Sequence, residues 1–367
     1  MASLGSVHSI SADAFVGIRK APDPAGALGA WQTTDNVAVA IPDITRPLDC
    51  RPALQALQAH LRGTMRVVIG LGLHRPMRPD ELQSLAPWNP VQHNPDDTTP
   101  TTVIDGIPGH VGRPIANADW SISIGIAELH QYAGISGGHK GVAVGCGGRD
   151  TIAALHHRDQ VTAPGVSVGQ LKNNPFRAAI DSLGEAARCR LALVYVPAAD
   201  QWLSGNPRQV IVEARKLIAP WVPIATNHQT ALLHVPDSKA MSLYQASRAA
   251  TYLALSPAPP IQDGGVLVLQ AACPEGLGTE AGFIKALSEH RPPWTALLTG
   301  RPPTGPGAQR AVMLAMLTRR FRLRITGCQS AETLRKIGID ATEAPANPRP
   351  DWLMVPSPFQ KIPQAIP

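Results

Sequence analysis

Short apolar runs alternate along the first part of the chain with segments whose apolar residues recur at helical spacing. The runs predict strands at 37–41, 65–71 and 120–126, and a further strand in RLALVYVP. The periodic segments predict helices around 52–62 and 79–86, and in GGRDTIAALHH, PFRAAIDSLGEAAR and PRQVIVEARKLIA. Such alternation is typical of a parallel sheet covered by helices. The predicted fold class is therefore α/β.

The same pattern continues in the second part of the chain, beyond a proline-containing segment near 220–226. Helices are predicted in MSLYQASRAATYLAL, TEAGFIKALSEH, AQRAVMLAMLTRR and SAETLRKI, and strands in GGVLVLQA and RLRIT. We expect an N-terminal domain at 1–222 and a smaller C-terminal α/β domain at 223–349. The tail 350–367, with the strand-like run DWLMVP, is expected to return to the first domain. Segments 91–117 and 291–307 are predicted to be loops.

Polar clusters follow three of the predicted strands. NVAVAIP leads into Asp43 and Arg46, MRVVIGLG leads into His74, and the third strand leads into a glycine-rich loop that contains His130 and Lys140. Ligands of open α/β sheets bind at the edge where the strands end. This inventory of an acid, cations and imidazoles suits proton transfer, anion binding and metal ligation.

Composition narrows the class of protein. The chain has 367 residues, which favours two domains, and a formal net charge of +6. Its basic residues are scattered and only 4% of its residues are aromatic, so nucleic-acid binding is disfavoured, whereas anionic small substrates remain compatible.

Cysteine usage and the N-terminal segment bear on location. The five cysteines show no CxxC pair, which argues against a disulfide framework or a thiolate zinc site. MASLGSVHSISADAF does not resemble a secretory signal, and no apolar stretch is long enough to span a membrane. We expect a cytoplasmic protein that does not bind membranes.

Six stretches of the chain are informative when they are taken together. They are IPDITRP at 41–47, GLGLHRP at 70–76, ELHQYAGISGGHKG at 128–141, the helix ending in His156, VGQLKNNP at 168–175 and LYQASR at 243–248. In this order, and over about two thirds of the chain, they resemble the nickel-dependent 2-hydroxyacid racemases and epimerases, the lactate racemase family, which carry a nickel-pincer nucleotide.

The resemblance implies two α/β domains with a cofactor cleft between them. Lys140 matches the lysine that attaches the cofactor, a nickel pyridinium-3-thioamide-5-thiocarboxylic acid mononucleotide, through a thioamide, and His156 matches the histidine that completes the nickel coordination. Soft sulfur and imidazole ligands suit nickel(II). The other residues expected to bind the cofactor are Asp43, Ser136, Gly137 and Gly138. Cofactor-biosynthesis proteins are the expected partners.

The reaction implied by the resemblance is a hydride shuttle. One histidine removes the hydroxyl proton while the Cα hydride moves to the cofactor, and the resulting 2-oxo acid is reduced again on its opposite face. His74 and His130 match the two catalytic acid/base histidines. Arg46 matches the residue that binds the substrate carboxylate, and Gln245 and Arg248 match substrate-binding residues of the second domain.

Two departures from the family pattern concern the substrate. The lactate enzyme has lysine where this chain has Arg248, and arginine where it has His139, so the substrate need not be lactate. His139, Arg75 and Arg248 are candidates to bind a second carboxylate. Malate, hydroxyglutarate, aromatic and sugar acids all remain open.

Other interpretations of the same residues stay open at this level. Lys140 behind glycines could hold a phosphate in a non-catalytic nucleotide-binding module, although the spacing is not GxxxxGK[ST]. A nicotinamide-dependent 2-hydroxyacid dehydrogenase is a further alternative, disfavoured because no GxGxxG opens a helix after the first strand. His157 competes with His156 for the role of ligand.

Overall fold

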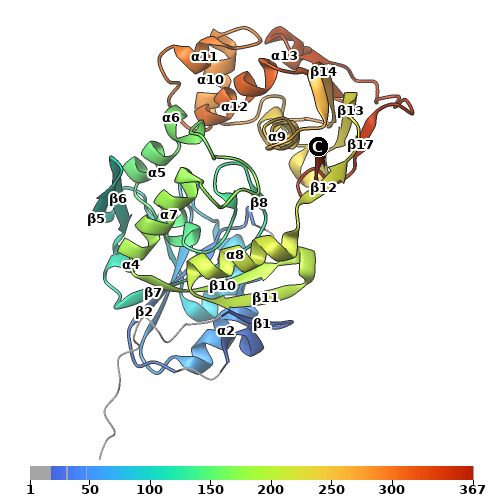
Figure 1. Cartoon of the computed structure of the whole chain (residues 1–367). Coiled ribbons are helices and arrows are strands. Elements are labelled where there is room, and N and C mark those ends of the chain that lie inside the picture. The colour runs from blue at the N-terminus through green and yellow to red at the C-terminus, as the bar shows by residue number, and fades with distance from the viewer. Residues whose placement is uncertain (1–17, 30–31, 47, 367) are drawn as a thin grey trace, which may run out of the picture. The chain divides into compact units, whose positions relative to one another are not determined.

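A computed structural model describes residues 18–29, 32–46 and 48–366 (Figure 1). The contacts divide the chain into two compact units. Unit 1 comprises the chain up to Glu128 together with Ile135–Leu155 and Leu171–Ile218, and unit 2 comprises Leu129–Gly134, His156–Gln170 and Ala219–Pro367. Two short segments that precede the main part of unit 2 in sequence therefore belong to it.

Unit 1 is built on a seven-stranded sheet whose centre is parallel. From β10 through β7, β2 and β3 to β4 all neighbours are parallel, whereas β11 and β1 add an antiparallel edge. This confirms the predicted parallel sheet and places three strands that end in polar clusters, β7, β2 and β3, side by side. In sheet order the strands are β1 (Arg19–Ala21), β11 (Gln201–Gly205), β10 (Cys189–Val196), β7 (Trp120–Ile126), β2 (Val37–Pro42), β3 (Met65–Gly70) and β4 (Val91–Gln92).

Helices cover both faces of this sheet, so its central strands are apolar on both sides. Val37 and Val39 of β2 pack with α1 and α2, while Ala38 and Ala40 pack in the cluster of α4 and a π-helix on the other face. α8 packs on β10 and β11, on the side of the sheet opposite to α2 (Figure 1). The helices of unit 1 are α1 (Pro24–Leu28), α2 (Arg51–His60), α3 (Pro79–Leu82), α4 (Arg113–Ala116), α5 (Arg149–Leu155), α7 (Pro175–Ala186), α8 (Pro207–Ile218), the π-helix (Gly141–Gly145) and 3₁₀ turns at Gln83–Trp88 and Pro197–Ala199.

The segment 91–117 was predicted to be a loop, and this prediction is wrong because the segment contains an antiparallel hairpin. Strands β5 (Thr98–Ile104) and β6 (Ile107–Gly112) pair on either side of Asp105 and Gly106. Both turn residues have positive φ, 49° and 80°. Asp-Gly is a strong signal for a two-residue hairpin, and the proline content of the segment obscured it.

Unit 2 contains a five-stranded parallel sheet. The predicted helices and strands beyond residue 240 are confirmed, and 291–307 contains one short helix. The sheet order is β16 (Asp340–Ala341), β15 (Arg322–Thr326), β14 (Ile261–Gln270), β13 (His228–His234) and β17 (Leu353–Val355). The helices are α6 (Arg158–Val161), α9 (Leu243–Ala254), α10 (Ala281–Glu289), α11 (Ala296–Thr299), α12 (Ala308–Thr318), α13 (Ala331–Lys336) and a 3₁₀ turn at Asp237–Lys239.

The C-terminal tail pairs within unit 2, which corrects the expectation that it returns to the first domain. β17 adds to the edge of the sheet beside β13, and β18 (Ile362–Ala365) pairs in parallel with β12 (Trp221–Ile224). An uncovered edge strand offers free backbone donors and acceptors, and the tail satisfies those of β13. DWLMVP thus contains a strand, as predicted, but this strand belongs to the sheet of unit 2 and not to that of unit 1.

All five cysteines are buried free thiols. Burial raises the pKa of Cys146 to about 12, so this thiol stays protonated near neutral pH and is no activated nucleophile. Within the described part of the chain, no helix combines the length and apolarity needed to cross a membrane.

Candidate active site

Asp43 and His74 meet at the carboxyl edge of the unit 1 sheet, because β2 and β3 are adjacent and parallel. His74 Nδ1 donates to Asp43 Oδ2 at 2.7 Å, and Thr45 donates to Asp43 Oδ1 through its amide (3.1 Å) and its hydroxyl (2.5 Å). Asp43 is 7% exposed. Burial alone would raise the pKa of Asp43, but the hydrogen bonds from His74 and Thr45 outweigh it and hold this pKa below its ordinary value.

An ionised Asp43 fixes the tautomer of His74. A carboxylate can only accept, so the imidazole carries its proton on Nδ1 and keeps a lone pair on Nε2. The His74 side chain is 55% exposed, which leaves that nitrogen accessible to a proton donor. Arg46 lies half-buried in the same turn, where its amide donates to Asp43 O at 3.2 Å.

The glycine-rich loop closes on the end of β7 through Ser136. The Ser136 amide donates to Glu128 O at 2.8 Å, and its hydroxyl donates to Ile126 O at 2.6 Å while accepting from the Glu128 amide. Both polar groups of Ser136 thus hold the loop. Gly137 and Gly138 follow with φ values of 90° and 62°, a conformation in which side chains are strained.

Lys140 is half-buried and immediately precedes the π-helix Gly141–Gly145. Single π-turns are rare and occur frequently at functional sites. Glycines let this turn sit directly on the sheet: a Cβ on Gly70 would lie 3.1 Å from Gly145, and a Cβ on Gly141 would overlap Ser123 Oγ of β7. The start of the π-helix therefore fixes the backbone of Lys140 above the sheet.

A buried ionic network lies under the same loop. His139 is 0% exposed and its Nδ1 lies 3.0 Å from Asp181 Oδ1 on α7. Arg177 donates to both oxygens of Asp181, at 2.6 and 3.1 Å, and to Gly137 O at 3.4 Å. Burial would raise the pKa of Asp181, but the hydrogen bond from His139 and the charge of Arg177 lower this pKa to about 2.

These contacts change the assignment of two candidates for a second carboxylate. His139 is turned into the protein against Asp181. Arg75 forms a two-point ion pair with Glu81, at 2.8 and 2.6 Å. Both side chains already have a carboxylate partner within the chain.

In unit 2, His130 lies on β8 (Leu129–His130), which pairs with the short strand β9 (Gly134–Ile135). Its Nδ1 accepts from the amides of Tyr132 (3.3 Å) and Ala133 (3.1 Å). The neutral imidazole therefore carries its proton on Nε2. His130 and His74 are held through the same ring nitrogen, but in opposite tautomers.

Tyr132 connects His130 to His156. Its ring makes edge contacts with both imidazoles, with centroids 5.7 and 5.9 Å apart, and burial raises the pKa of Tyr132 to about 12. The neighbouring His157 caps α6 instead, accepting from the Asp159 amide. His156 is thus the imidazole turned toward the loop of His130, whereas His157 is engaged at the start of α6.

Helix α9 places Gln245 and Arg248 in the same unit. Arg248 Nη2 donates to the hydroxyl of Tyr252 at 2.8 Å, Nη1 lies 3.4 Å from Gln245 Oε1, and the Tyr252 hydroxyl donates to Leu129 O at 3.0 Å. The guanidinium also lies 5.7 Å from the ring centroid of Phe359, in the tail. Helix, loop and tail together position Arg248.

Sequence reasoning missed the buried groups that support these residues. Thr251 donates to Gln131 at 3.0 Å, and Arg310 of α12 donates to the same amide oxygen. Arg310 could have been noticed as a cation that directly precedes the apolar run AVMLAML. Asp181 and Arg177 gave no comparable signal, because an i,i+4 pair is usually a solvated helix face.

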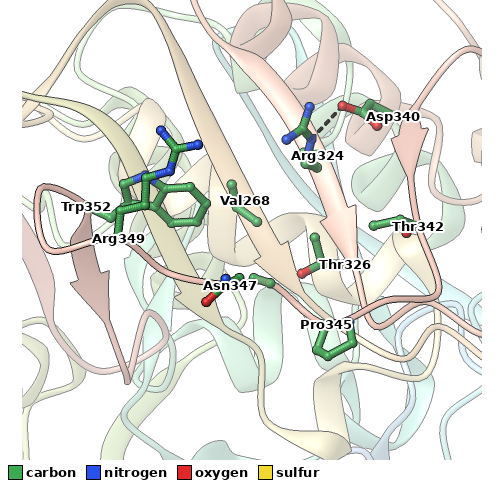
Figure 2. A pocket seen from close by; sticks show the side chains of 10 residues that line it. Val268, Arg324, Thr326, Asp340, Thr342, Pro345, Asn347, Arg349 and Trp352 are labelled. Carbon is green, nitrogen blue, oxygen red and sulfur yellow. Dashed lines mark hydrogen bonds and ion pairs between the residues drawn. The ribbon is translucent and has the colours of Figure 1, made fainter.

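A cavity of about 390 Å³ lies elsewhere on unit 2, and none of the predicted site residues lines it. Figure 2 shows the ion pair of Arg324 and Asp340, 2.6 Å, on one side of it and Arg349 with Trp352 on the other. In the parts that the structure describes, no cluster of three or more His, Cys, Asp or Glu side chains could hold a metal ion.

Comparison with known proteins finds a family model and curated relatives that are similar in sequence to this chain. The family model for the lactate racemase N-terminal domain matches residues 26–169. The lactate racemase of Thermoanaerobacterium thermosaccharolyticum is 24% identical over 312 residues, which is 77% of this chain and 71% of that protein. The lactate racemase of Lactiplantibacillus plantarum is 28% identical over 174 residues, or 43% of this chain and 41% of that protein.

Solved structures agree on the fold. The lactate racemase apoprotein from T. thermosaccharolyticum superposes with a TM-score of 0.81 at 18% identity, covering 97% of both chains. A protein from Thermotoga maritima gives a TM-score of 0.68 at 14% identity, covering 94% of this chain and 96% of its own. The family model over residues 26–169 and these relatives show that the chain is similar to lactate racemases in sequence and in fold.

Proposed function

We propose that the protein racemises or epimerises a 2-hydroxy acid by reversible hydride transfer from the substrate Cα, through a 2-oxo acid. The observation that carries the proposal is the Asp43–His74 pair, which holds an accessible imidazole nitrogen ready to accept a proton. When bound, a nickel-pincer nucleotide would supply the reversible hydride acceptor that no amino-acid side chain offers.

The two histidines handle the hydroxyl proton. His74 Nε2 accepts it from one enantiomer as the Cα–H bond breaks and the C=O bond of the 2-oxo acid forms. When hydride returns to the opposite face, the Nε2–H of His130 donates a hydrogen bond that stabilises the new alkoxide, which takes its proton from water while His74 returns its proton to water. Two groups are needed because the two enantiomers present their hydroxyls in different directions, and the opposite tautomers suit one to accept and the other to donate.

The residues present fit the proposed cofactor. Lys140 would attach it covalently, and His156 would contribute the one protein ligand to nickel, with sulfur ligands coming from the cofactor itself. A site with one protein ligand needs no cluster of acidic, histidine and cysteine side chains. Asp43 and the loop of Ser136, Gly137 and Gly138 would bind the rest of the cofactor, with the two glycines the better candidates for donating amides because Ser136 is engaged in holding the loop.

Substrate binding is assigned to Arg46, Gln245 and Arg248. A guanidinium can hold both oxygens of a carboxylate, which fixes the Cα–H bond relative to the bases. Cofactor-biosynthesis proteins belong to the same proposal, since Lys140 must be loaded. A cytoplasmic location does too, because buried free thiols are compatible with a reducing compartment.

The test is to replace Lys140 by Ala or by Arg and to produce each variant with the cofactor-making proteins. We expect intact mass to show a covalent adduct, with about one nickel per chain, in the wild type only. Lys140→Arg is the matched control, because it keeps the charge that a phosphate-binding lysine would need. Chiral 2-hydroxy acids would be screened by polarimetry. A Lys140→Ala protein with full racemase activity would refute the proposal, and nucleotide binding without nickel would favour a phosphate-binding module.

A further inference from the structure

Arg310 is a buried cation in unit 2, close to the proposed site residues. It is 6% exposed, and its Nη1 donates to Gln131 Oε1 and lies 3.4 Å from Thr251 Oγ1. Its guanidinium carbon lies 6.0 Å from the ring centroid of Tyr132 and 5.9 Å from that of Tyr244. Its neighbours are thus the loop that carries His130 and the helix that carries Gln245 and Arg248.

The described surroundings of Arg310 offer neutral acceptors but no anion. Among the residues that the structure describes, no Asp or Glu forms an ion pair with it. Its buried Nε–H has no acceptor, and neither has the buried amide nitrogen of Gln131, which is 5% exposed. Burial of a cation without a counter-charge costs several kcal/mol in proteins, and each unmet buried donor adds to that cost.

A purely structural role for Arg310 accounts for only part of this arrangement. The Nη1 hydrogen bond to Gln131 anchors the loop Leu129–Gly134, but a neutral donor could do the same. The positive charge, the Nε–H and the Gln131 Nε2–H groups are left over. A carboxylate carries a negative charge and two acceptor oxygens, so it supplies both kinds of partner that these groups lack.

The geometry points to a binding site for a second acidic group of the substrate, formed by Arg310 and Gln131. This inference rests on the proposed function and specifies its substrate class: a dicarboxylic 2-hydroxy acid. Within unit 2, Arg248 is already assigned to one acidic group of the substrate. The cation of Arg310, which has no counter-charge among the described residues of this unit, then matches a further negative charge on the ligand.

The experiment measures binding to the full-length protein without cofactor, by isothermal titration with malate, lactate and inorganic phosphate. We expect malate to bind at least about tenfold more tightly than lactate, since each charge-assisted hydrogen bond contributes about that factor. Arg310→Lys keeps the positive charge but loses the planar guanidinium with its paired N–H donors, and it should weaken malate binding about tenfold. Arg319→Met, at the exposed end of the same helix, is the matched control and should bind like the wild type.

Gln131→Glu gives an independent test that does not remove Arg310. The new carboxylate is nearly isosteric and would become an internal counter-ion, so we expect a higher melting temperature together with loss of malate binding. Unchanged malate binding in both Arg310→Lys and Gln131→Glu would overturn the inference. So would equal binding of malate and lactate by the wild type, or binding of phosphate alone, which would assign the site to a phosphate group.

These outcomes are separate from those that test the proposed function. The titrations need neither cofactor nor turnover, whereas the proposed function depends on an adduct at Lys140 and on racemisation. Malate binding that depends on Arg310, without any adduct, would leave this site standing and remove the proposed chemistry. Racemisation of lactate that is unaffected by Arg310→Lys would support the proposed chemistry and remove the Arg310 site.

Discussion

The hydrogen bond at Nδ1 gives His74 and His130 opposite tautomers, although the two imidazoles have the same intrinsic chemistry. His74 donates through Nδ1 to a carboxylate, whereas His130 accepts through Nδ1 from backbone amides. The first arrangement leaves a lone pair on Nε2 and the second leaves a proton there. The division between acceptor and donor is therefore set by Asp43 on one side and by the turn after His130 on the other.

Asp43→Asn tests whether the tautomer of His74 matters. The amide nitrogen of Asn would donate to Nδ1 and force the proton onto Nε2, the wrong nitrogen for a base. Turnover should fall by about 10²–10⁴-fold, the usual contribution of a positioned acid/base group. Thr45→Val is the control, because it removes a hydrogen bond from Asp43 and leaves His74 in place, and it should cost far less. Steady-state kinetics decide, and an Asp43→Asn enzyme with wild-type turnover would contradict the assignment.

At the scale of elements, the turn that carries Lys140 is fixed by close packing rather than by charge. Gly141 faces Ser123 of β7 and Gly145 faces Gly70 at the end of β3, so the π-helix approaches the sheet at backbone distance. Ser123 Oγ is buried and has no hydrogen-bond partner among the described residues. The small size of Ser123, and not its hydroxyl, is what the contact uses.

A double-mutant cycle measures this contact. Gly141→Ala places a methyl group onto Ser123 Oγ and should destabilise the protein by about 1–3 kcal/mol, the usual cost of overpacking. Ser123→Ala alone should be close to neutral, and combined with Gly141→Ala it should recover most of the loss. Urea denaturation gives all four free energies of unfolding. Strict additivity of the two substitutions would show that Gly141 and Ser123 are not coupled and would contradict this packing contact.

Helix α7 holds the glycine-rich loop from below through Asp181, and this contribution depends on pH. Because the pKa of Asp181 is lowered from 3.8 to about 2, its stabilisation is fully present above pH 3.8 and is lost as pH falls toward 2. Asp181→Asn leaves Arg177 and His139 without their carboxylate and should cost about 3–5 kcal/mol at pH 7. The difference in unfolding free energy from the wild type should shrink below pH 4. The more exposed Glu185→Gln should cost less than about 1 kcal/mol, and equal effects of the two would argue against the network.

For the whole molecule, strong hydrophobic periodicity was sufficient to predict most elements. That Asp43 and His74 lie at one edge of a parallel sheet was expected from the strands they follow, whereas their direct contact depends on the adjacency of β2 and β3, which only the structure gives. β13, written HQTALLH, escaped notice because its first half is polar, and the hairpin of β5 and β6 escaped because prolines obscured an Asp-Gly turn.

What sequence could not provide was the partition of residues between the two units. His130 and His156 are separated in sequence from α9 by many residues, yet both segments belong to unit 2 with it. Periodicity reports which face of an element is buried and not which neighbour buries it. The same limit explains the tail: DWLMVP reads equally well as an edge strand of either sheet, and only pairing with β13 decides.

The tail carries a prediction about the molecule as a whole, because Phe359 reaches the substrate residues assigned to α9. Its ring lies 5.7 Å from the guanidinium of Arg248 and 5.7 Å from the ring of Tyr252. Phe359→Ala should lower the free energy of unfolding by about 1–2 kcal/mol, since the side chain is half-buried, and should raise the KM several-fold by releasing Arg248. Phe359→Leu keeps most of the apolar volume without the ring face, so it should restore stability but not KM. If both variants kept the wild-type KM, the position of Arg248 would not depend on the tail, and Tyr252 and Gln245 would suffice to hold it.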